Sequence, residues 1–163
     1  MMDLNEQRCR NLLVALRKII QAIDQHSTQL KKKFGLTGPQ LIILQTVVDK
    51  ELISVTQLSK DVSLSQATVT NITKRLEYQG YLDRDKDTTD KRKINLMVTE
   101  KGKAILEKVP PLLQEKFTSK FSKLEDWEQL MIESAFNRVV SMMAAEDIEA
   151  SPIMITGEVI ETK

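Results

Sequence analysis

A stripe of apolar residues near the N-terminus limits the possible folds of this chain more than any other feature. Its members recur at spacings of three and four residues, as on one face of a helix: Leu12, Leu13, Leu16, Ile19, Ile20, Ile23, Leu30 and Phe34. The pattern predicts one amphipathic helix from about Asp3 to Lys33, ended by Gly35. Roughly thirty helical residues are about 45 Å long. A domain of this size cannot cover such a length by itself, so we expect part of the stripe to contact a second chain.

The composition favours a small, mainly helical protein. The chain has 163 residues, which suit one or at most two small domains, and only 4% aromatic residues, 5 Gly and 4 Pro. No apolar run approaches the roughly 18 residues that a membrane span needs, and the first ten residues are too polar for a signal peptide. The single cysteine, Cys9, cannot form an internal disulfide, so we expect a reducing cytoplasm.

Three S/T-x-x-Q segments each predict the start of a short helix. In this capping box the hydroxyl accepts a backbone N–H, and the glutamine reaches back to the N–H of the cap. The segments are 37–40, 54–57 and 63–66. They predict helices over about 38–50, 54–61 and 64–79, the last ended by Gly80. Two capped helices joined by only two or three residues, with a third in front, form a helix-turn-helix.

Residues 83–93, DRDKDTTDKRK, carry nine charges in eleven positions. They lie between two strand-like segments at about 81–85 and 93–98, so they overlap the ends of a β-hairpin and form its tip. One interpretation is a solvated loop. The other is the basic wing of a winged helix-turn-helix, a mainly α fold with a small β-hairpin wing.

The C-terminal third returns to helical periodicity from Thr99 onward. The Pro110-Pro111 pair should break or kink this helix, and Ser122-x-x-Glu125 is a further capping box that predicts a final helix to about Ala145. The apolar stripe of that helix has no evident partner in the chain except the first helix. We therefore expect four parts: an N-terminal dimerisation helix, a winged helix-turn-helix domain, C-terminal dimerisation helices and a tail, at 1–36, 37–99, 100–146 and 147–163.

The helix expected at 64–79 has two chemically different faces. Val69, Ile72 and Leu76 share one side and should face the core. The opposite side is polar and free of acidic residues, with amide, hydroxyl, methyl and ammonium groups that suit base edges and phosphates in a major groove. The alternative is the solvated face of an ordinary amphipathic helix. With the wing, the predicted DNA contacts are Ser65, Gln66, Ala67, Thr70, Asn71, Lys74, Arg75, Lys86, Asp90, Lys91 and Arg92.

In the wing, Lys86, Lys91 and Arg92 can reach the minor groove or its phosphates. Asp90 and Arg92 lie two residues apart at the start of a strand and hence on one face, so the carboxylate can orient the guanidinium. Regional charge agrees with a polyanionic partner for the first two thirds of the chain: the net charge is +3 over 1–58, +3 over 59–103 and −5 over 104–163.

The chain resembles the MarR family of bacterial transcriptional regulators over roughly residues 10–145. The resemblance is carried by TVTNITKRLEYQGYLDR (68–84), by Asp90-x-Arg92 and by INLMVTEKG (94–102). It implies a homodimer formed by the N- and C-terminal helices, a pseudo-palindromic operator in double-stranded DNA, usually repression, and a small-molecule effector in the cleft between the dimerisation helices and the winged domain. The wing tip has less arginine than is common in the family, which favours phosphate contact over insertion in the minor groove. Residues 26–44 are similar to the subgroup that governs compatible-solute genes, which suggests a role in osmotic stress.

Other candidate sites have simpler interpretations. Cys9, between two arginines, could sense peroxide as a thiolate or be incidental. His26, the only histidine, is a packed residue or a ligand, and one histidine makes no metal site. Trp127 and the nearby methionines suit interface packing or a ligand pocket. We expect no cofactor and no catalysis, because the sequence has no phosphate loop and no Cys/His set. A winged helix used only for protein–protein contact is the remaining alternative.

Overall fold

The computed structural model describes residues 3–86, 94–148, 150 and 153–154. The described residues form two compact units, one reaching to Pro110 and including Met154, the other running from Pro111 to Ile153. The chain is mainly helical with one small antiparallel sheet, as predicted. In the part of the chain that the structure describes, no helix combines the length and the apolarity needed to cross a membrane.

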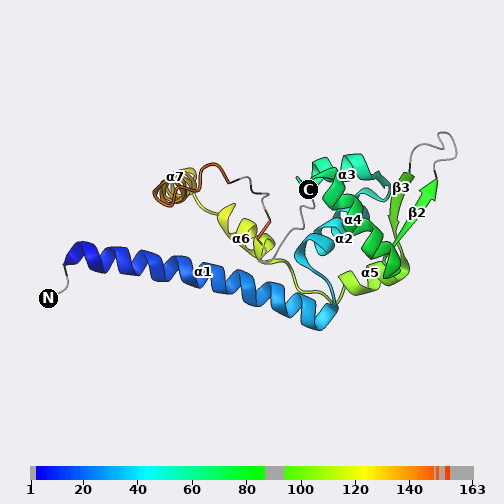
Figure 1. Cartoon of the computed structure of the whole chain (residues 1–163), viewed down its shortest axis with the longest axis horizontal. Helices are drawn as coiled ribbons and strands as arrows, with labels where there is room; N and C mark the ends of the chain where they lie inside the picture. Colours follow the sequence, from blue (N-terminus) through cyan, green and yellow to red (C-terminus); the bar gives the residue numbers. More distant parts are fainter. Residues whose placement is uncertain (1–2, 87–93, 149, 151–152, 155–163) are drawn as a thin grey trace. The chain divides into compact units, whose positions relative to one another are not determined.

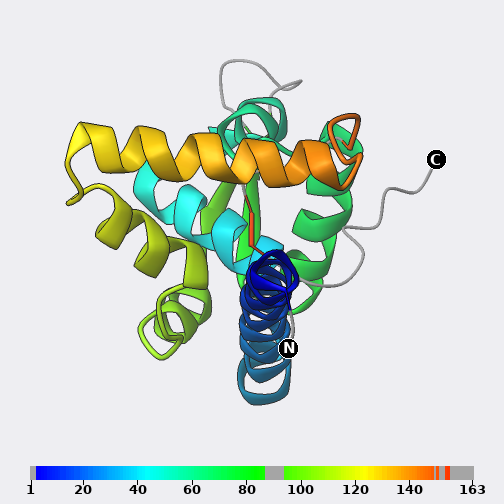
Figure 2. The same cartoon turned by 90° about the vertical axis from the view of Figure 1, so that its left-hand side faces the viewer.

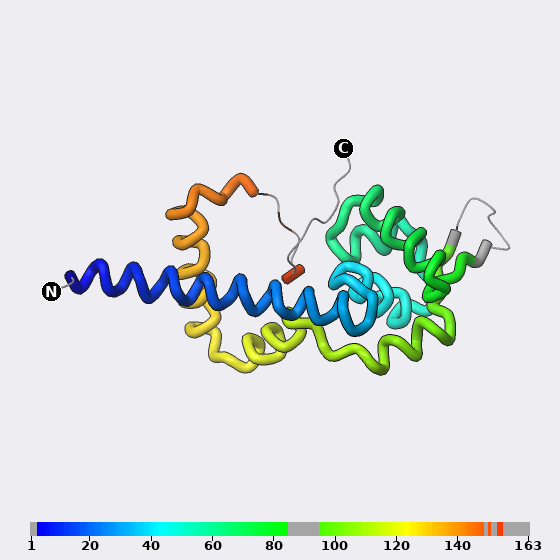
Figure 3. Tube along the Cα trace, turned by 60° about the horizontal axis from the view of Figure 1, so that its bottom comes forward, coloured from blue at the N-terminus to red at the C-terminus, as the bar shows by residue number. Residues whose placement is uncertain are grey.

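The first unit begins with the long helix α1, Leu4–Phe34, whose bounds differ from the prediction by one residue at each end. Figure 2 views the chain from the N-terminal end of α1, and in Figure 3 the helix is an unbroken rod. Gly35 ends it in the left-handed conformation (φ 66°), and its N–H donates to the carbonyl of Lys31 at 3.1 Å. Leu30 is the only buried residue of α1. Most of the predicted stripe is therefore not covered by the other described residues of the first unit.

Three helices, α2 (Gly38–Lys50), α3 (Val55–Asp61) and α4 (Gln66–Tyr78), form the helix-turn-helix. They gather beside the sheet in Figure 1. Their apolar faces enclose a core whose members are less than 2% exposed: Leu41, Ile43, Leu44, Val47, Leu58, Val69, Leu76, Leu82 and Leu96. Burying each such side chain contributes about 1.5–3 kcal/mol, so this core fixes the orientation of α4.

The sheet has strand order β1-β3-β2, with β1 at Ile53–Ser54, β2 at Leu82–Lys86 and β3 at Ile94–Val98. The predicted hairpin is present, with Leu82 opposite Val98 and Lys86 opposite Ile94. Strand β1 was not predicted, because two residues carry no alternation that a sequence could reveal. It pairs with β3 through Ile53 and Leu96, and so ties the start of α3 to the hairpin.

Helix α5 (Glu100–Leu106) follows β3 after a close backbone approach. The hydroxyl of Thr99 caps it, accepting from the N–H of Gly102 at 3.0 Å and donating to the carbonyl of Gly80 at 2.7 Å. A Cβ on Gly102 would meet the carbonyl oxygen of Tyr81 and, at 2.6 Å, the Cγ1 of Val98. Only glycine fits at this position.

The second unit contains α6 (Leu113–Phe121) and α7 (Asp126–Met142), the latter a straight helix in Figure 2. The Pro110-Pro111 pair breaks the helix, as predicted. The predicted cap at Ser122 is wrong: the N–H of Ser122 still donates to the carbonyl of Thr118 at 2.9 Å, so Ser122 ends α6. Glu125 begins α7 instead, and its N–H donates to Glu128 Oε2 at 3.0 Å. The final helix also stops at Met142, short of the predicted end.

Candidate nucleic-acid interface

Helix α4 begins at a different cap from the predicted one. Ser65 Oγ accepts the N–H of Thr68 at 3.1 Å, whereas Ser63 lies in the turn with φ 54°. Gln66, predicted to close a capping box on Ser63, instead donates from Nε2 to Thr56 Oγ1 on α3 at 3.2 Å. The first residue of α4 is thereby tied to α3, which fixes where the N-terminal end of α4 points.

Of the other two predicted capping boxes, the one at α2 is complete and the one at α3 is only half formed. At α2, Gln40 Oε1 accepts the N–H of Thr37 at 2.8 Å, as the box requires. At α3, Ser54 Oγ accepts the N–H of Gln57 at 3.2 Å. The reciprocal half of that box is absent because Gln57 Nε2 donates to Asp61 Oδ1 at 2.7 Å. Both helices nevertheless begin within one residue of the predicted position.

The buried face of α4 includes two of the three predicted residues. Val69 and Leu76 are fully buried, but Ile72 is only half-buried. Thr73 is fully buried, and its hydroxyl donates to the carbonyl of Thr70 at 3.1 Å. Because its polar group is satisfied by the helix backbone, this threonine can occupy a core position that the apolar pattern assigned elsewhere.

The opposite face of α4 presents most of the predicted DNA contacts to the exterior. The exposed members are Ser65, Gln66, Ala67, Asn71, Lys74 and Arg75. Thr70 is half-buried, and its hydroxyl donates to the carbonyl of Gln66 at 2.7 Å. The hydroxyl of Thr70 is therefore already hydrogen-bonded, and its methyl group remains available for apolar contact. The surface that these seven residues form is called the α4 face below.

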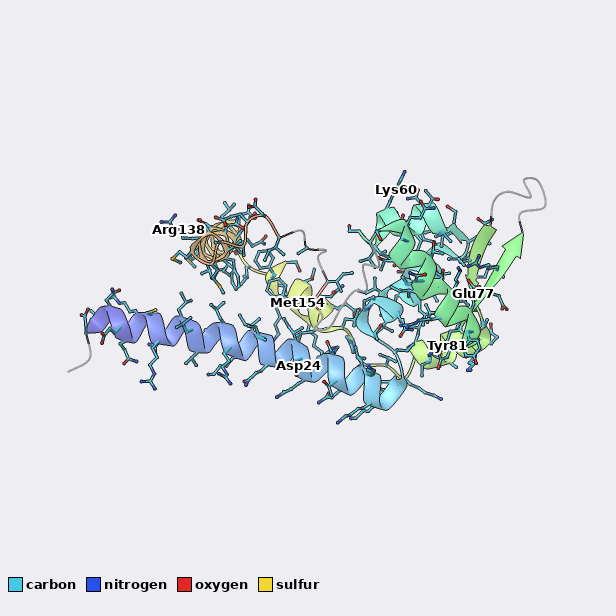
Figure 4. The ribbon with its side chains drawn as sticks, in the orientation of Figure 1. Asp24, Lys60, Glu77, Tyr81, Arg138 and Met154 are labelled. Carbon is cyan, nitrogen blue, oxygen red and sulfur yellow. The ribbon has the colours of Figure 1, made fainter. Side chains whose placement is uncertain are left out.

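The only acidic residue of α4, Glu77, is held away from the α4 face. Arg84 Nε on β2 donates to Glu77 Oε1 at 2.6 Å, and the two side chains are 31% and 25% exposed. Figure 4 labels Glu77 on the side of α4 toward the hairpin. The pair joins the helix to the wing and neutralises the one carboxylate that would repel a phosphate.

The wing residues are only partly within the structure. Lys86 is the last residue of β2 and pairs with Ile94 of β3. Asp90, Lys91 and Arg92 lie outside the described residues. The predicted Asp90–Arg92 pair and the predicted contacts of the tip therefore stay predictions.

Sequence reasoning missed Tyr78, whose side chain is 94% exposed at the C-terminal end of α4. Its spacing of four from Lys74 puts it on the same side of the helix and could have revealed it. Nearby, Lys101 Nζ donates to the carbonyl of Gln79 at 2.6 Å and lies 5.0 Å from the centre of the Tyr81 ring. Lys101 thus supports the end of α4 from the start of α5.

The remaining candidate residues do not form a reactive centre. Cys9 is exposed on α1 and His26 is half-buried there, while Trp127 on α7 is 65% exposed. Among the described residues, no group of three or more His, Cys, Asp or Glu side chains could hold a metal ion.

A helix-turn-helix followed by a β-hairpin, with the second helix of the motif exposed along one face, defines the chain as a winged helix-turn-helix protein. The sequence model of the MarR family matches residues 36–94, from the turn before α2 to the start of β3. Over these residues the chain is similar to the MarR family. The HTH-type transcriptional regulator SarZ of Staphylococcus epidermidis is 29% identical over 136 residues, which cover 83% of this chain and 88% of SarZ. Its name describes a regulator and not an enzyme, in line with the role expected from the sequence.

Solved structures agree on the fold. The MepR–DNA complex of S. aureus matches with a TM-score of 0.59 and 20% identity, covering 80% of this chain and 96% of MepR. A mutant MarR from E. coli, complexed with operator DNA, matches with a TM-score of 0.56 and 21% identity, covering 85% of this chain and 99% of that protein.

Proposed function

We propose that this chain is a transcriptional regulator that binds double-stranded DNA sequence-specifically, inserting α4 in the major groove. The observation that carries the proposal is the α4 face, an exposed polar and basic surface whose helix is fixed by a packed core. Asn71 and Gln66 can bond adenine edges, and Lys74 and Arg75 can contact guanine or phosphate. SarZ, named as a regulator, and two neighbours solved with DNA support the same role. A regulator of this kind works in the cytoplasm.

The active form that we propose is a homodimer. On α1, Leu13 and Ile20 are 59% and 60% exposed, and on α7 Leu130 and Met131 are 65% and 57% exposed. Apolar stripes of this kind are costly to leave in water and are typical of subunit interfaces. We assign residues 1–36 and 100–146 to dimerisation and 37–99 to DNA binding. Two α4 helices in one dimer would read a pseudo-palindromic operator.

The finer regulatory role rests on the family resemblance. We propose that the protein represses its targets and that a small molecule changes its affinity for the operator. Genes for compatible solutes and osmotic stress are the proposed targets, because residues 26–44 are similar to the regulators of such genes.

Selection of bound fragments from genomic DNA, followed by nuclease protection, tests the proposal. We expect a protected site with two half-sites, and binding that weakens steeply with salt because each phosphate contact releases counterions. In that site, Asn71→Ala should cost about 1–3 kcal/mol at one base position and little at the others. If Asn71→Ala discriminates among all site variants as the wild type does, α4 is not the reading element.

Two other functions make opposite predictions. If the fold serves only protein–protein contact, neutralising Lys74, Lys91 and Arg92 together will leave activity intact. If the protein is a thiol switch, Cys9→Ser will abolish the response to its natural signal. We expect loss of DNA binding in the first experiment and an unchanged response in the second.

A further inference from the structure

Gln66, the first residue of α4, is held by a helix other than its own. Among the described residues, it is the only member of the α4 face whose side chain bonds to another helix. Its Nε2 donates to Thr56 Oγ1 on α3 at 3.2 Å. Both residues are exposed, so the bond lies at the surface and a DNA base can approach the amide.

Thr56 is itself held firmly in α3. Its backbone carbonyl accepts the hydroxyl of Ser59 at 2.9 Å, and Ser59 is buried. The carbonyl of Ser59 in turn accepts the N–H of Leu64 at 3.1 Å, in the turn that joins α3 to α4. Leu58 of α3 and Val69 of α4 are both fully buried in the core. Thr56 Oγ1 is therefore an acceptor at a fixed position relative to the start of α4.

The bond to Thr56 leaves Gln66 able to read a base. A glutamine amide has two N–H donors and one oxygen acceptor. The bond uses one donor, so one N–H and Oε1 remain, and a bidentate contact with an adenine edge requires one group of each kind. A long side chain that is free before binding must be immobilised by the base, which weakens the contact by about two- to tenfold. Asn71, by contrast, bonds no other described residue through its side chain.

We propose that Thr56 is a positioning residue for the reading of DNA, which holds the amide of Gln66 in place before a base arrives. Thr56 acts through Gln66 and contacts no base itself. Gln66 is then the more stringent reader of the operator, and Asn71 adapts its side chain to the base that it meets. This inference rests on the proposed function and names one determinant of its specificity.

The test measures the affinity of the full chain for its selected DNA fragment and for the single-base variants of that site, at one salt concentration. Gln66→Ala identifies the base pair that Gln66 reads, where discrimination should fall by about five- to 150-fold. Thr56→Val removes the acceptor and should reduce discrimination at that base pair by about two- to tenfold, with none lost at the base pair that Asn71 reads. Thr56→Ser keeps the hydroxyl and should behave as the wild type.

Two controls separate positioning from other roles of α3. Gln57→Met changes the next residue of α3, whose amide donates to Asp61 instead, and should leave discrimination unchanged. In the Gln66→Ala background, Thr56→Val should have no further effect. The inference is overturned if Thr56→Val weakens binding to all site variants equally, since Thr56 then contacts a phosphate or only supports the fold. It is also overturned if the effect persists without Gln66, or if Thr56→Ser behaves as Thr56→Val does.

A measurement without DNA distinguishes this inference from the proposed function. NMR relaxation of the Gln66 side-chain amide should give a higher order parameter in the wild type than in Thr56→Val. An equally mobile amide in both proteins, in a chain that protects DNA, refutes the positioning role alone. An ordered amide in a chain that protects no DNA refutes the regulator, and the positioning role with it.

Discussion

The ion pair between Glu77 and Arg84 should couple α4 to the wing energetically. The two groups meet at 2.6 Å, and their side chains are 25% and 31% exposed. Fully exposed pairs contribute about 0.2–1 kcal/mol, whereas breaking a fully buried pair costs about 3–5 kcal/mol. A pair that is a quarter to a third exposed lies between these limits, and we expect a coupling free energy of about 1–2 kcal/mol.

A double-mutant cycle measures this coupling. Glu77→Gln, Arg84→Met and the double variant are unfolded in urea, and the coupling is the non-additive part of their free energies of unfolding. Protein concentration is held fixed, because dimer stability depends on it. The control cycle uses Glu100 and Lys103, which meet at a similar 2.8 Å but have side chains 90% and 55% exposed. The hydrogen bond to Glu100 raises the pKa of Lys103, so the lysine keeps its charge at neutral pH.

The two cycles differ in burial and little in distance. We expect a clear coupling for Glu77–Arg84 and none resolved for Glu100–Lys103. Equal couplings would show that partial burial does not strengthen the first pair, and the argument would fail. Added salt supplies a second check, since 1 M NaCl should reduce the coupling of the half-buried pair only in part.

Three further perturbations follow from the packing. Ser65→Ala removes the oxygen that caps α4 and should lower the free energy of unfolding by about 1 kcal/mol, measured in urea; no change would mean that another group takes over the cap. Gly102→Ala forces a methyl group against the carbonyl of Tyr81 and should cost about 1–3 kcal/mol, and an unchanged midpoint of unfolding would contradict this close approach. Leu13→Lys with Ile20→Lys places two charges on the exposed stripe of α1 and should give monomers by sedimentation. A dimer that survives both changes would exclude this stripe from the interface.

Most helix boundaries could be predicted because local chemistry sets them. Gly35 ends α1 by adopting a positive φ, and the side chain of Gln40 bonds back to the cap of α2. These interactions join residues at most four apart, so the sequence pattern contains both partners. The proline pair before α6 acts equally locally, by removing hydrogen-bond donors.

The wrong predictions have tertiary causes. Gln66 bonds Thr56, ten residues away, and α4 is capped by Ser65 instead of Ser63. Strand β1 exists only because β3 lies beside it, and two residues alone predict nothing. Thr73 is buried although the helical wheel placed only Val69, Ile72 and Leu76 on the core side, because neighbouring elements of the fold cover it. Each depends on a neighbour that sequence periodicity cannot identify.

The features of the candidate site also fall into those that the sequence could predict and those that it could not. The exposed side of α4 followed from a helical wheel, which needs only the period of a helix. The hollow of about 440 Å³ that Lys31 and Lys74 both line did not follow from the sequence, because these two residues are far apart in it. Tyr78 was not predicted for a different reason: aromatic rings are usually at least partly buried, and this one is 94% exposed.

The ion pair of Arg84 explains part of the charge run at 83–93. Arg84 pairs with Glu77 of α4 and with no acidic residue of its own run in the part that the structure describes. One basic group of the run therefore neutralises the sole acid of α4 and fixes strand β2 against it. A near-neutral composition over 83–93 consequently does not imply that the α4 face is near-neutral. Removal of Glu77 alone would leave Arg84 without its ion-pair partner and would loosen the contact between β2 and α4. The neutralisation of charge and the placement of the wing therefore both depend on the Glu77–Arg84 pair.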